Sequence, residues 1–182
     1  EMMEFQITQE YLGQATHLVY EGPMFKEILE SKINASQSVI DVLTNKNNEL
    51  SGMSGVANIG NDINWCGHPF AQANWYAYGR LAWDPHHKAS DIANEWIMQT
   101  WSREKTVVDT IQHIMMSSYE NMVKYMTPLG LHHIMGNGHH YGPMPWGNTL
   151  GRADWNPVYY HRSDAFGVGF DRSQSGSNAI SQ

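Results

Sequence analysis

The sequence predicts an α+β fold that is mainly α-helical, and two observations predict it. Apolar and polar residues alternate at the start of the chain, as is typical of a strand, and residues 70–126 carry apolar side chains at helical spacing. From residue 129 the chain is rich in Gly, His, Trp, Tyr and Pro with little periodicity, which indicates long aromatic loops. With 182 residues the chain is long enough to bury a core.

The first predicted element is a strand over residues 2–11, "MMEFQITQEY". Successive side chains of a strand point to opposite faces, so Phe5 and Ile7 share one face. Beyond Met2, the other face is polar and carries Glu4, Gln6, Thr8 and Glu10. A polar strand face is costly to bury unless it meets water, a ligand or other polar groups. The lumen or the mouth of a barrel provides such surroundings.

Five helices should follow the strand, over residues 22–31, 36–44, 70–83, 90–101 and about 105–126. Pro23 suits the first turn of the first helix, and Ser36 and Ser90 are expected as N-caps of the second and fourth. Their helical stripes place four tryptophans in the core, namely Trp75, Trp83, Trp96 and Trp101. The stretch 52–68 holds four glycines and three asparagines, and we expect it to be a loop at the surface or at the rim of a site.

Composition narrows the functional classes. The formal net charge is −7, which gives nucleic-acid binding no support, and there is no apolar run of about 18 residues that would span a membrane. The single cysteine, Cys66, excludes an internal disulfide. Because the strand pattern starts at once after Glu1, we expect the chain to be a piece of a longer protein. No signal-peptide pattern is visible, and the sequence indicates no location.

Glu10 is the first candidate for chemistry, because catalytic groups of a (β/α)₈ barrel sit at the C-terminal ends of its strands. Glu4 lies six residues away, roughly 20 Å along a straight strand. The two catalytic carboxyl groups of a glycosidase lie only about 5–9.5 Å apart, so Glu4 and Glu10 cannot form such a pair. A catalytic Glu10 would need a partner from another strand. The alternative is that Glu10 is a solvated residue at the strand end.

The loops after residue 129 hold further candidates. "HHIMGNGHHYGP" contains two His pairs, but the sequence has no acid between Glu120 and Asp154 that could complete a metal site. We therefore expect no metal there. The alternatives are a polar loop that binds a ligand and a structural role. Trp146 and Trp155 lie in loops, where they either pin the loop to the core or form a wall for a sugar ring. Asp62, which stands among glycines, is expected to make a turn rather than to act as a base.

Several stretches together resemble one family, the α-glucuronidases of glycoside hydrolase family 67. The stretches are "MMEFQITQEYLGQATHLVY", "GMSGVANIGNDINWCGHPFAQANWYAYGRLAWDP", "YMTPLGLHHIM", "HYGPMPW" and "RADWNPVYYHR". The resemblance implies that residues 1–65 are the end of a (β/α)₈ catalytic barrel. It implies that residues 66–182 belong to an incomplete helical C-terminal domain.

The resemblance also implies a reaction. Enzymes of this kind remove 4-O-methyl-glucuronic acid from xylo-oligosaccharides (aldouronic acids) with inversion and without a metal or cofactor. In such enzymes an Asp and a Glu activate water, and the glutamate of "ITQEY", Glu10, matches that Glu. The Asp, the general acid and the uronate-binding groups would lie upstream of Glu1. The family places a tryptophan against the sugar, which matches Trp155 first and Trp146 second. A homodimer through the C-terminal domain is also expected.

Two other classes of function stay open at this point. One is a non-catalytic helical module that binds sugar or forms dimers. The other is a metal-dependent hydrolase built on the His pairs of residues 132–140.

Overall fold

The computed structural model describes residues 2–7, 18–45, 47, 50–57, 68–126, 135–136, 141–144, 146–153, 156 and 158. The chain divides into two compact units. The first consists of Glu1–Thr8 with Leu18–Tyr119, and the second of Gln9–His17 with Glu120–Gln182. Each is considered by itself below.

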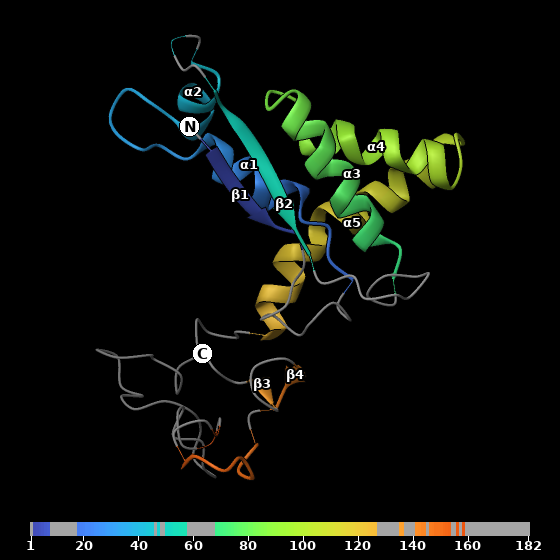
Figure 1. The fold of residues 1–182 in the computed structure, drawn as a ribbon. Helices are drawn as coiled ribbons and strands as arrows, with labels where there is room; N and C mark the ends of the chain where they lie inside the picture. The colour runs from blue at the N-terminus through green and yellow to red at the C-terminus, as the bar shows by residue number, and fades with distance from the viewer. Residues whose placement is uncertain are drawn as a thin grey trace. The chain divides into compact units, whose positions relative to one another are not determined.

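The described elements confirm a mainly helical α+β fold (Figure 1). In chain order they are β1 (Met2–Gln6), α1 (Gly22–Glu30), α2 (Val39–Leu43), β2 (Gly52–Val56), α3 (Phe70–Trp83), α4 (Ala89–Thr100), α5 (Lys105–Met126), β3 (Met135–Gly136) and β4 (Tyr141–Pro143). The two short strands β3 and β4 pair antiparallel in the second unit. No helix within the described ranges is long and apolar enough to cross a membrane.

Strands β1 and β2 form a parallel pair, in register from Met2 opposite Gly52 to Gln6 opposite Val56. The prediction that residues 52–68 form a loop is therefore wrong for residues 52–56. The glycines that suggested a loop are tolerated because β1 supplies the ladder hydrogen bonds. At Gly55 the Ile7 side chain and the Tyr78 ring occupy the space that a side chain would need. A glycine inside a strand often marks such a close approach.

The first two helices differ in how well their starts were predicted. Pro23 lies in the first turn of α1, as expected, and Phe25 and Leu29 are buried. The predicted N-cap Ser36 is wrong. The cap of α2 is Ser38, which forms a capping box with Asp41: its hydroxyl accepts from the Asp41 backbone N–H at 3.3 Å, and its own N–H donates to the Asp41 carboxylate at 2.7 Å. A reciprocal pair of this kind satisfies two otherwise unpaired N–H groups.

The N-cap prediction also fails at α4. The helix begins at Ala89 after an extended Lys88, which gives no side-chain cap, and the Ser90 hydroxyl lies 3.4 Å from the Asp91 carboxylate instead. The sequence pattern was correct for the buried face of this helix, since Ile92, Ala93, Trp96 and Ile97 are all buried.

Two of the four tryptophans that were expected in the core are exposed. Trp96 is 3% exposed and Trp75 packs partly buried against the core, whereas Trp83 is 86% and Trp101 is 53% exposed. Trp83 is the last residue of α3 and Trp101 follows the last residue of α4. Both tryptophans therefore lie at the ends of their helices, beyond the part that packs against the core.

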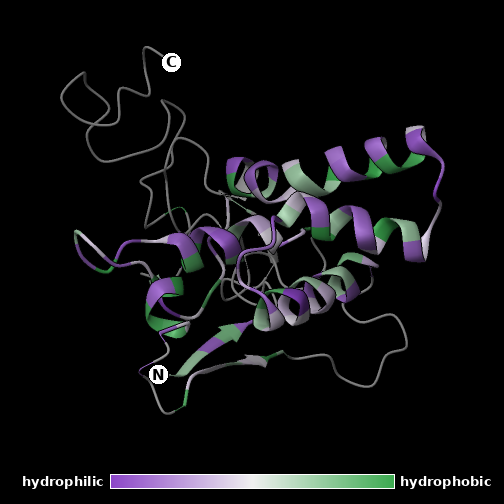
Figure 2. Cartoon of the chain, turned by 90° about the horizontal axis from the view of Figure 1, so that it is seen from above, coloured by the Kyte–Doolittle hydropathy of each residue, from purple (hydrophilic) through white to green (hydrophobic). Residues whose placement is uncertain are grey.

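The core of the first unit lies between the strand pair and the helices, and Figure 2 shows the helices on one side of the two strands. The buried face of α3 consists of Phe70, Ala71, Ala73, Asn74, Ala77 and Leu81. Ala82, next to Leu81 in the sequence, is exposed. On α5, Val108 and Met115 are buried, whereas Val107 and Ile114 are exposed.

Candidate functional site

The strand pair has one buried and one exposed face. Phe5 and Ile7 are buried, and the Phe5 ring meets the Phe25 ring of α1 edge-on at 5.3 Å. Glu4 and Gln6 lie on the opposite, exposed face, as the alternation predicted. The neighbouring strand continues that face, since the Ser54 hydroxyl donates to the Glu4 carboxylate at 3.4 Å. The strand pair therefore turns an exposed face with polar groups away from its helices.

The chain enters α1 through the entry segment, which we define as residues Leu18–Glu21. Val19, Tyr20 and Glu21 of this segment are all buried. The segment follows residues 8–17, which contain Glu10 and come directly after β1. In a parallel β/α arrangement, the connection from strand to helix is the part that carries catalytic groups.

Four buried hydrogen bonds hold the entry segment. The Asn74 side chain on α3 accepts from the Glu21 N–H at 2.8 Å and donates to the Val19 carbonyl at 3.0 Å. The Tyr20 N–H donates to the Ser118 hydroxyl of α5 at 2.8 Å, and the Tyr20 hydroxyl donates to the Ala89 carbonyl of α4 at 3.0 Å. Three helices thus fix the position of this short piece of irregular backbone.

Glu21 is a buried acid. Its side chain is only 3% exposed, and its Oε2 atom has no hydrogen-bond partner among the described residues. Burial raises the pKa of Glu21 from its ordinary 4.5 to about 8, because desolvation disfavours the charged form. The carboxyl group is accordingly mostly neutral at pH 7.

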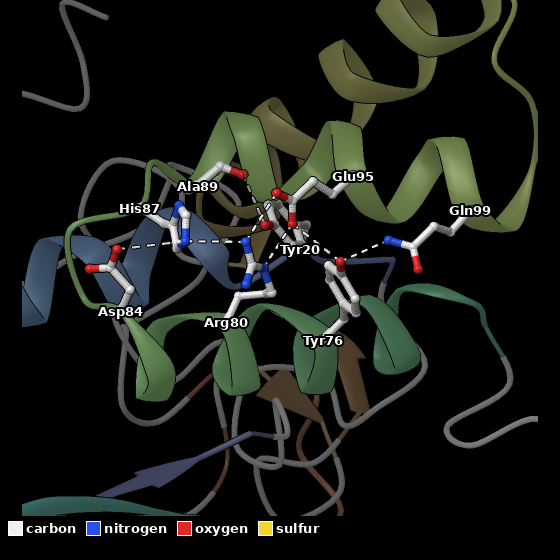
Figure 3. A network of polar contacts seen from close by, with 8 residues as sticks. All are labelled: Tyr20, Tyr76, Arg80, Asp84, His87, Ala89, Glu95 and Gln99. Atoms are coloured by element: carbon white, nitrogen blue, oxygen red, sulfur yellow. Dashed lines mark hydrogen bonds and ion pairs between the residues drawn. The ribbon is translucent and has the colours of Figure 1, made fainter.

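A polar network on one side of the entry segment ties α3 to α4 (Figure 3). The Arg80 guanidinium donates to both Glu95 oxygens, at 2.8 and 3.1 Å, and the resulting hydrogen bonds keep the pKa of Glu95 below its ordinary value. Tyr76 donates to Glu95 at 3.2 Å and accepts from Gln99 at 2.8 Å. Because a guanidinium only donates, the His87 Nε2 atom, 3.1 Å from Arg80, must be the acceptor. This network joins two helices and is structural.

The loop that carries Trp146 is organised by Asn156, whose side chain is buried. The Asn156 oxygen accepts from the Leu150 N–H at 2.8 Å, and its amide nitrogen lies 3.0 Å from the Arg152 carbonyl and 3.3 Å from the Ala153 carbonyl. Trp146 itself is 70% exposed, in a turn closed by a hydrogen bond from the Gly147 N–H to the Met144 carbonyl at 2.8 Å. An exposed indole on a braced loop can offer a flat face to a ligand.

The other sequence-predicted candidates lie outside the described residues. These are Glu10, Asp62, Cys66, the His pairs at 132–133 and 139–140, and Trp155. Within the part of the chain that the structure describes, no three side chains of His, Cys, Asp or Glu gather as a metal site would require. The roles of Glu10, Trp155 and Trp146 therefore stay predictions.

Sequence reasoning missed Asn74, Glu21 and Asn156. A signal existed for Asn74, since it stands one turn after Phe70 and three residues before Ala77, on the stripe that becomes the buried face. A polar residue at a core position calls for a partner. For Glu21 and Asn156 no local pattern distinguishes a buried side chain from a solvated one.

Comparison with known proteins gives two family matches and several similar relatives. Residues 1–65 match the family description "Glycosyl hydrolase family 67 middle domain", and residues 66–182 match "Glycosyl hydrolase family 67 C-terminus". Alpha-glucuronidase A of Emericella nidulans is 40% identical over 181 residues, which is 94% of this chain and 20% of that protein. Alpha-glucuronidase A of Aspergillus tubingensis is 35% identical over 181 residues, covering 92% of this chain and 21% of the relative.

These matches define a class of carbohydrate-cleaving protein. The chain belongs to glycoside hydrolase family 67. It spans about a fifth of the length of the curated relatives that it matches.

Proposed function

We propose that this chain supplies the end of the catalytic barrel and much of the C-terminal domain of an α-glucuronidase. The reaction is hydrolysis, with inversion, of the α-1,2 bond that links glucuronic acid or its 4-O-methyl ether to xylo-oligosaccharides. The names of its relatives, alpha-glucuronidase A, support the hydrolase class. The substrates are aldouronic acids released during xylan breakdown.

The observation that carries the proposal is the strand pair. β1 and β2 are parallel, with helices against the face that holds Phe5 and Ile7 and an exposed face that holds Glu4 and Gln6. Two parallel strands with helices on one face are the repeating part of a (β/α)₈ barrel, in which the other face lines the interior. In the proposed barrel, Glu10 follows β1 at the catalytic edge.

In the proposed reaction Glu10 acts as a general base. An inverting glycosidase holds its two carboxyl groups about 6.5–9.5 Å apart, which leaves room for the attacking water. Glu10 accepts a proton from that water as the water attacks the anomeric carbon, while an acid from another part of the protein protonates the leaving oxygen. No metal or cofactor is part of this proposal.

The aromatic loops of the second unit supply the substrate wall. Trp155 is the first candidate and Trp146 the second. The exposure of Trp146, at 70%, supports a binding role, because an indole that pinned its loop to a core would be covered. The buried Asn156 braces the loop that carries Trp146.

The test is hydrolysis of aldotriouronic acid by the full-length protein, followed by proton NMR of the first product. Inversion at an α-linked glucuronic acid releases the β-anomer first, and mutarotation then equilibrates it. Early release of the α-anomer would contradict the inverting mechanism, and the absence of any hydrolysis would contradict the function. The 182-residue chain alone is the negative control, since the proposed general acid is not part of it.

A further inference from the structure

The connection between α1 and α2 carries the sequence Asn34-Ala35-Ser36. It is the one place in the chain where an asparagine is followed, two positions on, by serine or threonine. This pattern, with any residue except proline in the middle, is the acceptor pattern of N-linked glycosylation. A glycan is bulky and needs a site at the surface. All residues from 31 to 37 are exposed, so the connection meets that requirement.

The oxygen of the Asn34 side chain stabilises a turn. It accepts from the backbone N–H groups of Ser36 and Gln37, each at 3.0 Å, and from the Ser36 hydroxyl at 3.0 Å. The Ile33 N–H donates to the Gln37 carbonyl at 2.9 Å and closes the loop around this turn. The structural work of the Asn34 side chain is therefore done by its oxygen.

The nitrogen of the same amide has a different setting. It donates to the Gln37 side-chain oxygen at 3.1 Å, in a contact between two exposed side chains. Water can replace such a contact at little cost in free energy. A side-chain amide nitrogen carries two hydrogens, so a sugar that replaces one of them leaves the oxygen able to accept as before. The folded turn can thus keep its hydrogen bonds when the nitrogen of Asn34 is modified.

We infer that Asn34 carries an N-linked glycan. The co-reactant is an oligosaccharide attached through its first sugar to a lipid pyrophosphate. The Asn34 nitrogen forms a bond to C1 of that sugar, the bond from C1 to the pyrophosphate oxygen breaks, and the lipid pyrophosphate leaves with the electron pair. The nitrogen gives up one proton to a base of the transferase, and nothing is oxidised or reduced. This inference does not depend on the proposed hydrolase activity.

The place of Asn34 in the fold suits a bulky group. The strands β1 and β2 are parallel, α1 follows β1 in the chain, and α2 precedes β2, so the connection between the helices lies toward the amino ends of the strands. Figure 1 shows α2 beside the N-terminal end of β1. Catalytic groups of a (β/α)₈ barrel lie at the opposite, carboxyl ends. The glycan would therefore stand away from that edge, and it would cover the neighbouring Ile33, which is 57% exposed.

The experiment reads the modification at a single residue. The full-length protein from its native cells is denatured and treated with peptide N-glycosidase in heavy-oxygen water, which removes the glycan and converts its asparagine to a labelled aspartate. Trypsin cuts after Lys32 and Lys46, and mass spectrometry of the peptide 33–46 locates the label. Asn45 in the same peptide is an internal control, because it is not followed by a serine or threonine two positions on. We expect the label at Asn34 and none at Asn45.

Three variants test whether the acceptor pattern is responsible. They are made in the full-length protein in the secretory pathway of a eukaryotic host, beside the wild type. Ser36→Ala should lose the label, because it removes the hydroxyl that the pattern requires, and Ser36→Thr should restore it. Gln37→Ala is the matched control: it changes an exposed residue of the same loop, and the side-chain partner of the Asn34 nitrogen, but leaves the pattern intact. It should keep the label.

Three results would overturn the inference. The first is an unlabelled Asn34 in the native protein, whatever the host cells produce. The second is a label that persists in Ser36→Ala, because the labelled aspartate would then arise without the acceptor pattern. The third is an equal loss of label in Ser36→Ala and Gln37→Ala, because the shape of the loop and not the pattern would then control the reaction. Hydrolysis of aldotriouronic acid is measured separately, so a failure of the proposed function leaves this test unaffected.

Discussion

The hydroxyl of Tyr78 on α3 donates a hydrogen bond of 2.8 Å to the carbonyl of Met53 on β2, and so brings the Tyr78 ring over Gly55. A β-carbon on Gly55 would lie 2.9 Å from that ring and closer still to the Ile7 side chain. Because Gly55 has no side chain, the Tyr78 ring of α3 and the Ile7 side chain can both pack against the strand at this position. This contact fixes how α3 sits on the two strands.

Gly55→Ala should destabilise the protein by roughly 1–3 kcal/mol, because overpacking forces the Ile7 or Tyr78 side chain to move. The free energy of unfolding is measured in urea. Gly79→Ala is the matched control: nothing lies within 4 Å of a β-carbon at that helical position. Alanine is the better helix former there by up to about 1 kcal/mol, so stability should rise. Equal effects of the two variants would contradict this packing.

Glu10→Gln should lower kcat for aldotriouronic acid by about 10²–10⁴-fold in the full-length protein, because the amide cannot take a proton from water. Binding of substrate should survive. Glu4→Gln is the control, since Glu4 lies on the same predicted strand face roughly 20 Å away. A normal kcat in Glu10→Gln together with a large loss in Glu4→Gln would mean that the wrong glutamate is named.

Glu21→Gln should stabilise the protein at neutral pH. The unfolded state releases the Glu21 proton above pH 4.5, whereas the folded state, with a pKa of about 8, retains it. Stability contributed by this group is therefore fully present below pH 4.5 and falls as pH rises toward 8, by at most about 1.4 kcal/mol per pH unit. A glutamine at position 21 is neutral at every pH, so Glu21→Gln does not lose this stability as the pH rises.

The measurement is the thermal midpoint of both proteins from pH 4 to pH 9. The gain in Glu21→Gln should be small near pH 4, grow with pH and level off above pH 8. Glu27→Gln, at an exposed position of α1, is the control. A constant difference between Glu21→Gln and wild type across this range would show that Glu21 is not held as a neutral acid.

Trp155→Ala should raise KM for aldotriouronic acid with little change in the fold, because loss of a stacking face weakens binding. Trp146→Ala is the second test. Trp83→Ala is the control: Trp83 is the more exposed side chain, at 86% against 70% for Trp146, but it lies at the end of α3. Steady-state kinetics and circular dichroism separate binding from folding. If only Trp83→Ala raises KM, the assignment of both loop tryptophans is wrong.

Local patterns in the sequence were enough to predict several elements of the structure. The alternation around Phe5 predicted the faces of β1, and the apolar spacing predicted α3, α4 and α5 to within a few residues. These patterns are visible because the partners in a helix turn or along a strand are close in sequence. Family-characteristic stretches such as "ITQEY" likewise indicated the family that the comparisons confirmed.

Other features depend on contacts between segments that are far apart in the sequence. Whether residues 52–56 form a strand depended on β1, fifty residues earlier, and whether Trp83 is buried depended on where α3 leaves its neighbours. The side chain of Asn74 forms its hydrogen bonds with Val19 and Glu21, which are 55 and 53 positions away in the sequence. Such contacts leave no local pattern, because a buried hydrogen bond is specified by where two segments meet and not by the residues beside either partner.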